Sequence, residues 1–325
     1  MKIGVTGASG HVGANLTRVL LQKKYSVRVL EHEDRRAIEG LDVDIVKGKL
    51  DDKISLDQFC KGIDVVFHLA ARISIGANSF ETLHKINVEG TQNLVKACKQ
   101  AGVKRFIYFS SIHALQHAPL DQPLDESRPL VKDSPQAYER TKSMGEEWIF
   151  SQKTNDFEVI VLNPTAVVGP IDYKPSLMGQ LLIKLYKGNL PGLVPGGYNW
   201  VDVRDVAAAA SNAINNGKSG EHYILSGKWY SIKEFADLLE QVSGKKIVNM
   251  VLPIWLARIG VPFIHLWSVI TNQQPLYTNE SLDIIGQGNK NILNDKARKE
   301  LGFNPRPLSD SINDALNWFK ENNYI

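Results

Sequence analysis

Cysteine is scarce in this sequence: only Cys60 and Cys98 occur among its 325 residues, and they do not form a CxxC pair. Small secreted folds held by several disulfides are therefore excluded. We expect two reduced thiols, in separate elements of a cytoplasmic protein. No metal site is predicted.

Long apolar runs are also missing. The longest apolar tract, from Val251 to Ile270, is interrupted by Pro253, Arg258, Pro262 and His265, so we expect no membrane span. The first apolar run is not preceded by a basic segment, and we therefore expect a strand there instead of a signal peptide.

The sequence has little excess of charge. Its 38 Lys and Arg residues are nearly balanced by 35 Asp and Glu residues, the formal net charge is +3, and neither sign is clustered. Nucleic acids and membrane surfaces are thus not expected partners. The hydrophobic content of 43% and charged content of 22% are those of a soluble globular protein.

Glycine is placed regularly at the start of the chain. An apolar run is followed by Gly7, Gly10 and Gly13 and then by a helical segment. In a turn that binds a dinucleotide, Gly7 would allow the tight bend, Gly10 the approach of the pyrophosphate, and Gly13 the packing of helix on sheet. The first residues of the helix, His11 and Val12, would offer free N–H groups to the phosphates.

The second predicted strand, residues 26–30, ends at Glu31. A carboxylate there can accept hydrogen bonds from both hydroxyls of the adenosine ribose and would repel a 2′-phosphate, which slightly favours NAD. His32, Arg35 and Arg36 follow directly and could bind a 2′-phosphate, so NADP remains open.

Strand and helix patterns alternate along the first half of the chain, and this alternation predicts an α/β fold of the Rossmann type, with a doubly wound parallel sheet. Further strands are predicted near residues 44–48, 64–71, 105–111 and 222–225. Helices are predicted near residues 55–61, 80–101, 135–153, 206–214, 232–242 and 308–322.

A smaller, discontinuous substrate lobe is expected in the second half. Residues 171–198 are interpreted as loop-rich, and 200–215 with 221–227 as a return to the sheet. We therefore assign 1–170 with 199–228 to the dinucleotide-binding domain, and 171–198 with 229–325 to the substrate lobe. Aromatic residues of this lobe would form either a second core or an apolar pocket: Trp229, Trp255, Phe263 and Trp267.

The segment Tyr138-Glu139-Arg140-Thr141-Lys142 indicates an acid–base pair. On a helix, a spacing of four places Tyr138 and Lys142 on one face, one turn apart. An isolated phenol has a pKa near ~10, and a neighbouring ammonium favours the phenolate. We therefore expect Lys142 to lower the pKa of Tyr138. Taken alone, the motif is more often an exposed helix pair, since such pairs are common on helix surfaces.

With several other motifs, this segment resembles the extended short-chain dehydrogenase/reductase superfamily, the NAD-dependent epimerase/dehydratase family. The similarity runs along most of the chain. The run at residues 159–164 is closer to the dihydroflavonol 4-reductase and 3β-hydroxysteroid dehydrogenase-like branch than to the sugar-nucleotide enzymes. The other motifs are the Gly-x-x-Gly-x-x-Gly turn, His68-Leu69-Ala70-Ala71, Asn87-Val88-Glu89-Gly90-Thr91, Asn163-Pro164-Thr165-Ala166-Val167-Val168-Gly169-Pro170, residues 201–206 and Leu301-Gly302-Phe303-Asn304-Pro305.

The resemblance implies an NAD(P)-dependent oxidoreductase that interconverts a secondary alcohol and a carbonyl. Tyr138 would be the general acid/base, Lys142 would lower its pKa and bind the nicotinamide ribose, and Ser111, or failing that Ser110, would bind the substrate oxygen. The implied cofactor-binding residues are Gly7, Gly10, His11, Val12, Gly13, Glu31, Leu50, Leu69, Ala70, Ala71, Asn87, Tyr138, Lys142, Pro164 and Val167.

Four further positions carry expectations. Lys49 replaces the acid that relatives use near the adenine. His68 is expected to be a hydrogen-bonded strand residue and not a ligand. Asn87 is expected to face the active site inside its helix, with Gly90 permitting close packing. His113 is a candidate for the substrate pocket, and a packing role is the equal alternative.

Two other functions stay open. One is a sugar-nucleotide epimerase or dehydratase that recycles NAD, since Asn163 is retained from that pattern. The other is a non-catalytic dinucleotide-sensing protein, although such relatives usually lose the tyrosine or lysine. The expected substrate is a small molecule, apolar or ring-containing. The resemblance also implies a homodimer, paired through the helices near 80–101 and 135–153.

Overall fold

The computed structural model describes residues 1–73, 79–259, 282, 285–286 and 288–325. Its main element is a seven-stranded sheet of order β3-β2-β1-β4-β5-β6-β9, in which every neighbouring pair is parallel. The direction of winding reverses between β1 and β4, which is where doubly wound sheets bind their ligands. The strands are β1 (Lys2–Thr6), β2 (Ser26–Glu31), β3 (Asp44–Lys47), β4 (Val65–His68), β5 (Arg105–Phe109), β6 (Glu158–Pro164) and β9 (Glu221–Leu225).

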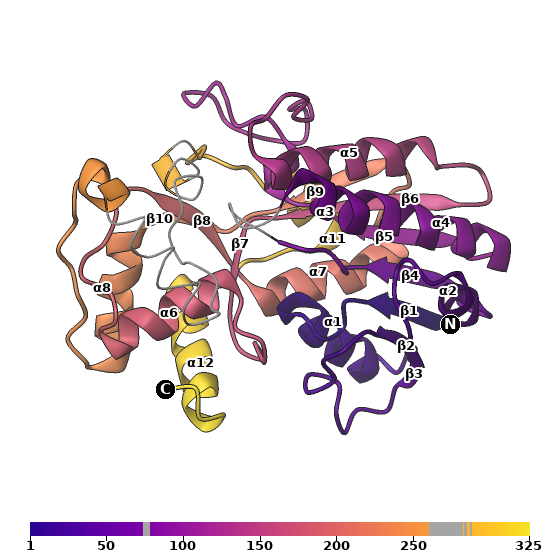
Figure 1. Cartoon of the computed structure of the whole chain (residues 1–325), viewed down its shortest axis with the longest axis horizontal. Helices are drawn as coiled ribbons and strands as arrows, with labels where there is room; N and C mark the ends of the chain where they lie inside the picture. Colours follow the sequence, from indigo (N-terminus) through magenta and orange to yellow (C-terminus); the bar gives the residue numbers. More distant parts are fainter. Residues whose placement is uncertain (74–78, 260–281, 283–284, 287) are drawn as a thin grey trace.

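Helices cover both faces of this sheet (Figure 1), as predicted. The alternation of side chains along each strand explains why both faces are apolar. On β4, Val65 and Phe67 pack into one buried cluster, and Val66 packs into the other. The first face carries α1 (His11–Gln22), α7 (Val203–Asn216) and α11 (Asp295–Leu301), and the second carries α2 (Lys53–Cys60), α4 (Gly90–Ala101) and α5 (Ala137–Ser151).

The helix predicted over residues 80–101 contains an irregular turn. It consists of α3 (Phe80–His84), a π-helical segment (Lys85–Glu89) and then α4. Single π turns inside α-helices are typical of functional sites. The wider turn contains Asn87, which explains how an asparagine is accommodated inside this helix.

A second, smaller layer lies beside the main sheet (Figure 1). Its three strands have the order β10-β8-β7, and rings of Trp200 and Phe235 stack with centroids 4.3 Å apart in its core. The elements are β7 (Ala166–Val168), β8 (Gly197–Asp202), β10 (Lys228–Ser231), α6 (Leu177–Lys187), α8 (Ile232–Ser243) and α12 (Leu308–Glu321).

Two expectations for this half are corrected. Residues 171–198 contain the regular helix α6, because the apolar run between Leu177 and Leu185 has a helical period and Ser176 caps it. Only part of the segment 200–215 returns to the main sheet. Its first residues belong to β8, which ends at Asp202 in the small sheet, and the following helix α7 packs on α1.

The predicted domain division stays a prediction, but the contacts bear on its bounds. Helix α11 falls in the predicted substrate lobe, yet Ala297 and Leu301 pack into the first cluster of the main sheet. Trp255 is 63% exposed and thus not part of a second core. Phe263 and Trp267, and the end of the Val251–Ile270 tract, lie outside the described residues.

The two cysteines lie in different helices, as expected. Cys60 ends α2 and Cys98 lies in α4, and both are buried and unbridged, with their sulfurs 3.6 Å apart. Burial raises the pKa of the Cys98 thiol, which keeps it protonated and unreactive. No helix within the described ranges is long and apolar enough to cross a lipid bilayer.

Candidate functional site

The glycine turn after β1 is packed against the end of β4. Gly7 has φ +74°, and a Cβ on it would lie 2.6 Å from the backbone nitrogen of Ala70. A Cβ on Gly13 would lie 2.1 Å from the carbonyl oxygen of Gly7. At Gly10 the nearest atom, the same oxygen, would be 3.4 Å away, so this residue is not required by packing. Gly10 therefore keeps the turn open for the close approach of a ligand.

Helix α1 begins at the next residue, His11, and its N-cap is Gly10, which has no side chain for capping. Its first turn also lacks an acidic residue. The backbone N–H groups of His11 and Val12 thus remain available to an anion, at the positive end of a 12-residue helix. These features fit a dinucleotide pyrophosphate.

The end of β2 offers an acceptor for a sugar. Glu31 is 9% exposed, and its Oε2 atom is buried with no hydrogen-bond partner in the described part of the chain. Nearby, Arg36 is held by the carboxylate of Asp34 at 2.7 and 3.0 Å. The side chain of His32 is 53% exposed. The buried group at this strand end is therefore the carboxylate.

We expected Asn87 to face the active site, but its side chain is held by the backbone of Arg72. Its Oδ1 accepts a hydrogen bond from the backbone N–H of Arg72 at 2.8 Å, and its Nδ2 donates to the Arg72 carbonyl at 3.1 Å. Asn87 thus fixes the segment after β4, which contains Leu69, Ala70 and Ala71. Gly90 permits close packing, as expected, because a Cβ there would lie 2.9 Å from Leu50.

His68 is a hydrogen-bonded residue of β4, as expected. Its two ring nitrogens lie 2.7 Å from the hydroxyl of Thr6 and 2.9 Å from that of Thr91. Burial lowers the pKa of His68 to about 3, and the charge of Lys142 acts in the same direction. The ring is therefore neutral at physiological pH.

Tyr138 and Lys142 lie on the same face of α5, and both are buried. Burial raises the pKa of Tyr138 to about 12, with the side chain of Ser111 acting in the opposite direction. The expectation that Lys142 lowers this pKa is not met: burial raises it, and the group that opposes the rise is Ser111. The Lys142 ammonium instead donates to the carbonyl oxygen of Phe109 at 2.9 Å. Burial lowers the pKa of Lys142 to about 8, and Glu146 opposes that change.

Ser110 and Ser111 follow β5 directly. The hydroxyl of Ser111 accepts the N–H of His113 at 3.2 Å and caps a short 3₁₀ turn, Ile112–Ala114. The Ser110 hydroxyl is buried and, among the residues that the structure describes, has no partner. Both side chains remain candidates for contact with a substrate oxygen.

His113 lies beside Tyr138, with ring centroids 6.4 Å apart. It stacks on His117 at 5.5 Å, and its Nδ1 lies 3.5 Å from the carboxylate of Glu139. The sequence singled out His113 alone. Glu139 belongs to the acid–base segment, but nothing in the sequence pattern connected it or His117 with His113.

The other predicted site residues follow the same edge of the sheet. Pro164 ends β6, and Val167 lies in β7, partly buried against the first cluster. Carboxyl ends of parallel strands meet at one edge, so the ends of β1, β2, β4, β5 and β6 converge there with the start of α5. This edge is the candidate active site.

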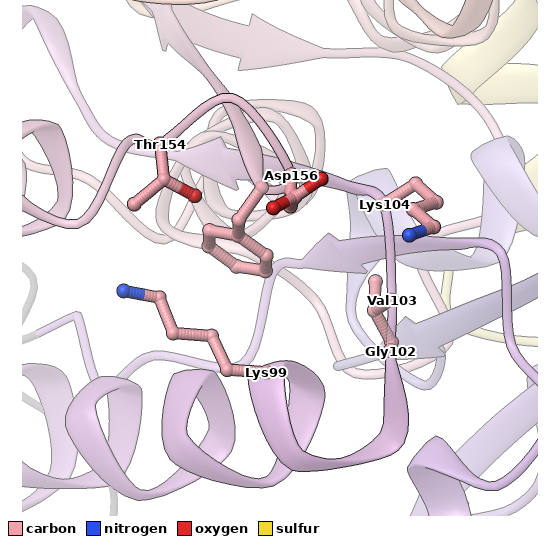
Figure 2. A pocket seen from close by; sticks show the side chains of 7 residues that line it. Lys99, Gly102, Val103, Lys104, Thr154 and Asp156 are labelled. Carbon is pink, nitrogen blue, oxygen red and sulfur yellow. The ribbon is translucent and has the colours of Figure 1, made fainter.

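Figure 2 shows a hollow elsewhere in the molecule. It has a volume of about 350 Å³ and lies where β5 and β6 begin, at the opposite edge of the sheet. None of the predicted site residues lines it. Its lining residues are Lys99, Gly102, Val103, Lys104, Thr154, Asp156 and Phe157.

Two neighbours of the site were missed from the sequence. Glu146 lies one helical turn beyond Lys142 and is fully buried, and His222 on β9 contacts it. The position of Glu146, four residues after Lys142 and eight after Tyr138, could have placed it on the same face of α5. His222 had no comparable signal.

This architecture belongs to a known class. Residues 3–226 match the model of the NAD dependent epimerase/dehydratase family. The chain therefore belongs to that family, within the extended short-chain dehydrogenase/reductase superfamily, as predicted.

Individual relatives cover nearly the whole chain. It is 30% identical to Sterol demethylase protein B of Methylococcus capsulatus, with 99% of each chain covered. It is 31% identical to a putative dihydroflavonol 4-reductase of Synechocystis, over 99% of this chain and 95% of the relative. The crystal structure of gox2253 is 33% identical and superposes with a TM-score of 0.84 over 98% of each chain.

These similarities confirm the predicted branch of the superfamily and show that the chain is an enzyme. The alternative of a non-catalytic dinucleotide sensor is therefore not supported. The family is NAD-dependent and includes oxidoreductases and epimerases.

Proposed function

We propose that the chain is an NAD-dependent oxidoreductase that interconverts a secondary alcohol and a carbonyl. The observation that carries the proposal is the grouping of Ser111, Tyr138 and Lys142 at the carboxyl edge of the sheet, the same edge at which the glycine turn follows β1. A hydroxyl, a phenol and an ammonium there can bind and protonate an oxygen next to a dinucleotide.

The chain fits the cofactor at three points. The N–H groups of His11 and Val12 would bind the pyrophosphate above Gly10, Glu31 would accept hydrogen bonds from the adenosine ribose, and Lys142 would donate to the nicotinamide ribose. Bound nicotinamide supplies or accepts the hydride at the substrate carbon. The remaining members of the predicted set would form the walls of this site: Gly7, Gly13, Leu50, Leu69, Ala70, Ala71, Asn87, Pro164 and Val167.

Tyr138 would handle the proton. With its pKa raised to about 12 by burial, its phenol is protonated at neutral pH and can donate to a carbonyl oxygen while the carbon receives hydride. In the reverse direction Tyr138 would accept the proton from the alcohol. Ser111 would hold the same oxygen in place. A protonated phenol is the form that reduction of a carbonyl requires.

We expect the protein to bind NAD in preference to NADP. Among the described residues, one carboxylate oxygen of Glu31 is buried and has no partner, which suits ribose hydroxyls and opposes a 2′-phosphate. One candidate for binding that phosphate, Arg36, already makes two hydrogen bonds to Asp34.

The position of Asn163 favours a reductase over a sugar-nucleotide epimerase or dehydratase. Its amide nitrogen donates to the Ser111 carbonyl and to Glu146, and its side chain is fully buried, so the amide is not exposed to a sugar substrate. The names of the relatives, a sterol demethylase protein and a putative dihydroflavonol reductase, support a ring-containing apolar substrate.

A homodimer is proposed from the family resemblance alone. The contact would involve the helical region of α3 and α4 and the helix α5. Sedimentation of the purified protein at micromolar concentration would give the dimer mass if this is correct. A monodisperse monomer would reject it.

The function is tested by incubating the protein with NADH and, in separate reactions, progesterone, dihydroquercetin or acetone. A parallel reaction contains NAD and UDP-glucose. We expect net loss of NADH with at least one ring-containing ketone. Conversion of UDP-glucose without net change in NADH absorbance would instead establish the epimerase alternative.

A further inference from the structure

A buried carboxylate lies directly behind the proposed catalytic residues. Glu146 is on α5, one turn after Lys142, and its side chain is fully buried. Its Oε1 lies 2.9 Å from Nδ1 of His222 on β9, and its Oε2 accepts a hydrogen bond from Asn163 on β6 at 2.8 Å. A buried carboxylate with two such partners is held in one orientation.

Asn163 connects this carboxylate to the substrate side of the site. The same amide nitrogen donates to the carbonyl oxygen of Ser111 at 3.1 Å. Ser111 begins the 3₁₀ turn that carries His113. The network therefore runs from α5 through β6 to the turn after β5, and it joins the helix of Tyr138 to the backbone of Ser111.

His222 is the charge partner of Glu146. One ring nitrogen faces the carboxylate, and the other lies 2.7 Å from the carbonyl oxygen of Glu126. Both neighbours are acceptors, so a doubly protonated imidazolium satisfies them both. Burial lowers the pKa of His222, but the hydrogen bond and charge of Glu146 outweigh it, and the pKa is raised overall.

The other titratable and charged groups around the pair act on it from each neighbouring element. Lys142 lies on the same helix, and the Tyr108 hydroxyl on β5 is sensitive to the charge of Glu146. From α11, Lys296 donates to the His222 carbonyl at 2.8 Å and also to Glu221 of β9. The pKa of His222 is lowered by Lys296, but less than Glu146 raises it.

We propose that Glu146 is a positioning residue, which ties the Ser111 turn to the helix of Tyr138 and Lys142 through Asn163, and that His222 balances its charge. The role rests on the proposed function, because Ser111, Tyr138 and Lys142 are taken as the reacting set. Glu146 itself would not touch the substrate. It would set the distance between the group that binds the oxygen and the group that protonates it.

The test compares Glu146→Gln with Glu147→Gln. Glutamine keeps the size of the side chain and removes the charge, and Glu147 is the exposed neighbour on the same helix. The first readout needs no substrate: the C2 proton of His222 is titrated by NMR, assigned with His222→Gln. We expect its pKa to fall in Glu146→Gln and to remain unchanged in Glu147→Gln. An unchanged value in both would overturn the charge pairing.

The second readout is the pH dependence of NADH oxidation with the ring-containing ketone that is consumed. In Glu146→Gln we expect kcat to fall by about 10- to 100-fold, which is typical of misplaced catalytic groups. The loss of activity at basic pH, where Lys142 loses its proton, should begin at lower pH, because Glu146 raises the pKa of Lys142. At acidic pH, where Lys142 is charged in both proteins, NADH affinity should stay close to that of wild type. His222→Arg, which keeps the positive charge, should retain turnover, whereas His222→Leu should not.

Failure of the proposed function can be distinguished from failure of the positioning role of Glu146. If Tyr138→Phe turns over at the wild-type rate, the proposed function fails, and the NMR titration still decides whether Glu146 and His222 are paired. If Tyr138→Phe is inactive but Glu146→Gln has the rate and pH profile of Glu147→Gln, the function stands and the positioning role is rejected.

Discussion

The ammonium group of Lys142 donates a hydrogen bond to the carbonyl oxygen of Phe109, the last residue of β5, at 2.9 Å. This contact ties α5 to the strand end from which Ser110 and Ser111 emerge. It also explains why Lys142 is found buried, since the ammonium has a backbone acceptor and the nearby carboxylate of Glu146.

The first prediction is that NADH affinity and turnover decrease at basic pH because Lys142 loses its proton. Burial lowers the pKa of Lys142 to about 8, so the ammonium is lost as pH rises through that value. We expect NADH affinity and turnover to fall above pH ~8. Lys142→Arg keeps its charge at that pH, so its NADH affinity, measured by fluorescence titration, should not show this decrease. The same decrease in both proteins would contradict the assignment.

The second prediction concerns cofactor choice. Wild type should bind NADH more tightly than NADPH, because Glu31 opposes a 2′-phosphate. Glu31→Gln removes the charge, and the preference for NADH should fall by about tenfold, or roughly 1.4 kcal/mol. Glu33→Gln, whose side chain is 78% exposed, is the matched control. Stronger binding of NADPH by wild type would reject the role of Glu31.

The third prediction separates two glycines of the same turn. Gly13→Ala would place a Cβ 2.1 Å from the Gly7 oxygen, and we expect the free energy of unfolding to fall by about 3 kcal/mol. Gly10→Ala meets that atom only at 3.4 Å, so stability should change little while NADH binding weakens. Denaturant titration and NADH fluorescence measure both effects. Equal loss of stability in the two variants would argue against this division of roles.

The fourth prediction concerns acid stability. His68 has a pKa of about 3 in the folded protein, below that of an unfolded histidine, so between those values the unfolded chain binds more protons. Its contribution to stability is present above pH ~6.5 and is lost at up to about 1.4 kcal/mol per pH unit as pH falls.

Denaturant titrations between pH 4 and 7 compare wild type with His68→Asn and with the control His32→Asn, which replaces an exposed residue. The slope of stability against pH should be reduced only in His68→Asn. If all three proteins share one slope, His68 does not carry the effect.

Much of the main sheet could be predicted because its strands are short apolar runs ended by small or polar residues, as in β4 before Ala70. Helix α6 was not predicted because it has only 11 residues, and the prolines and glycines around it within residues 171–198 are typical of loops. The π turn at Lys85–Glu89 could not be predicted, since one added residue hardly changes the pattern of buried positions.

The site was predictable where chemistry follows spacing along one element, as for Tyr138 and Lys142. It was not predictable where contacts join distant segments. Glu146 and His222 are 76 positions apart, and only the pairing of β6 with β9 brings the second beside the first. The raised pKa of Tyr138 likewise depends on burial, which a motif does not report.

The central claim is that Tyr138 transfers the proton in an NAD-dependent reduction. The most direct measurement compares wild type with Tyr138→Phe in NADH binding and in NADH oxidation with the ring-containing ketone that is consumed. The account predicts a loss of turnover of about 10²- to 10⁴-fold, the usual contribution of a general acid, with NADH affinity little changed. Undiminished turnover in Tyr138→Phe would contradict it.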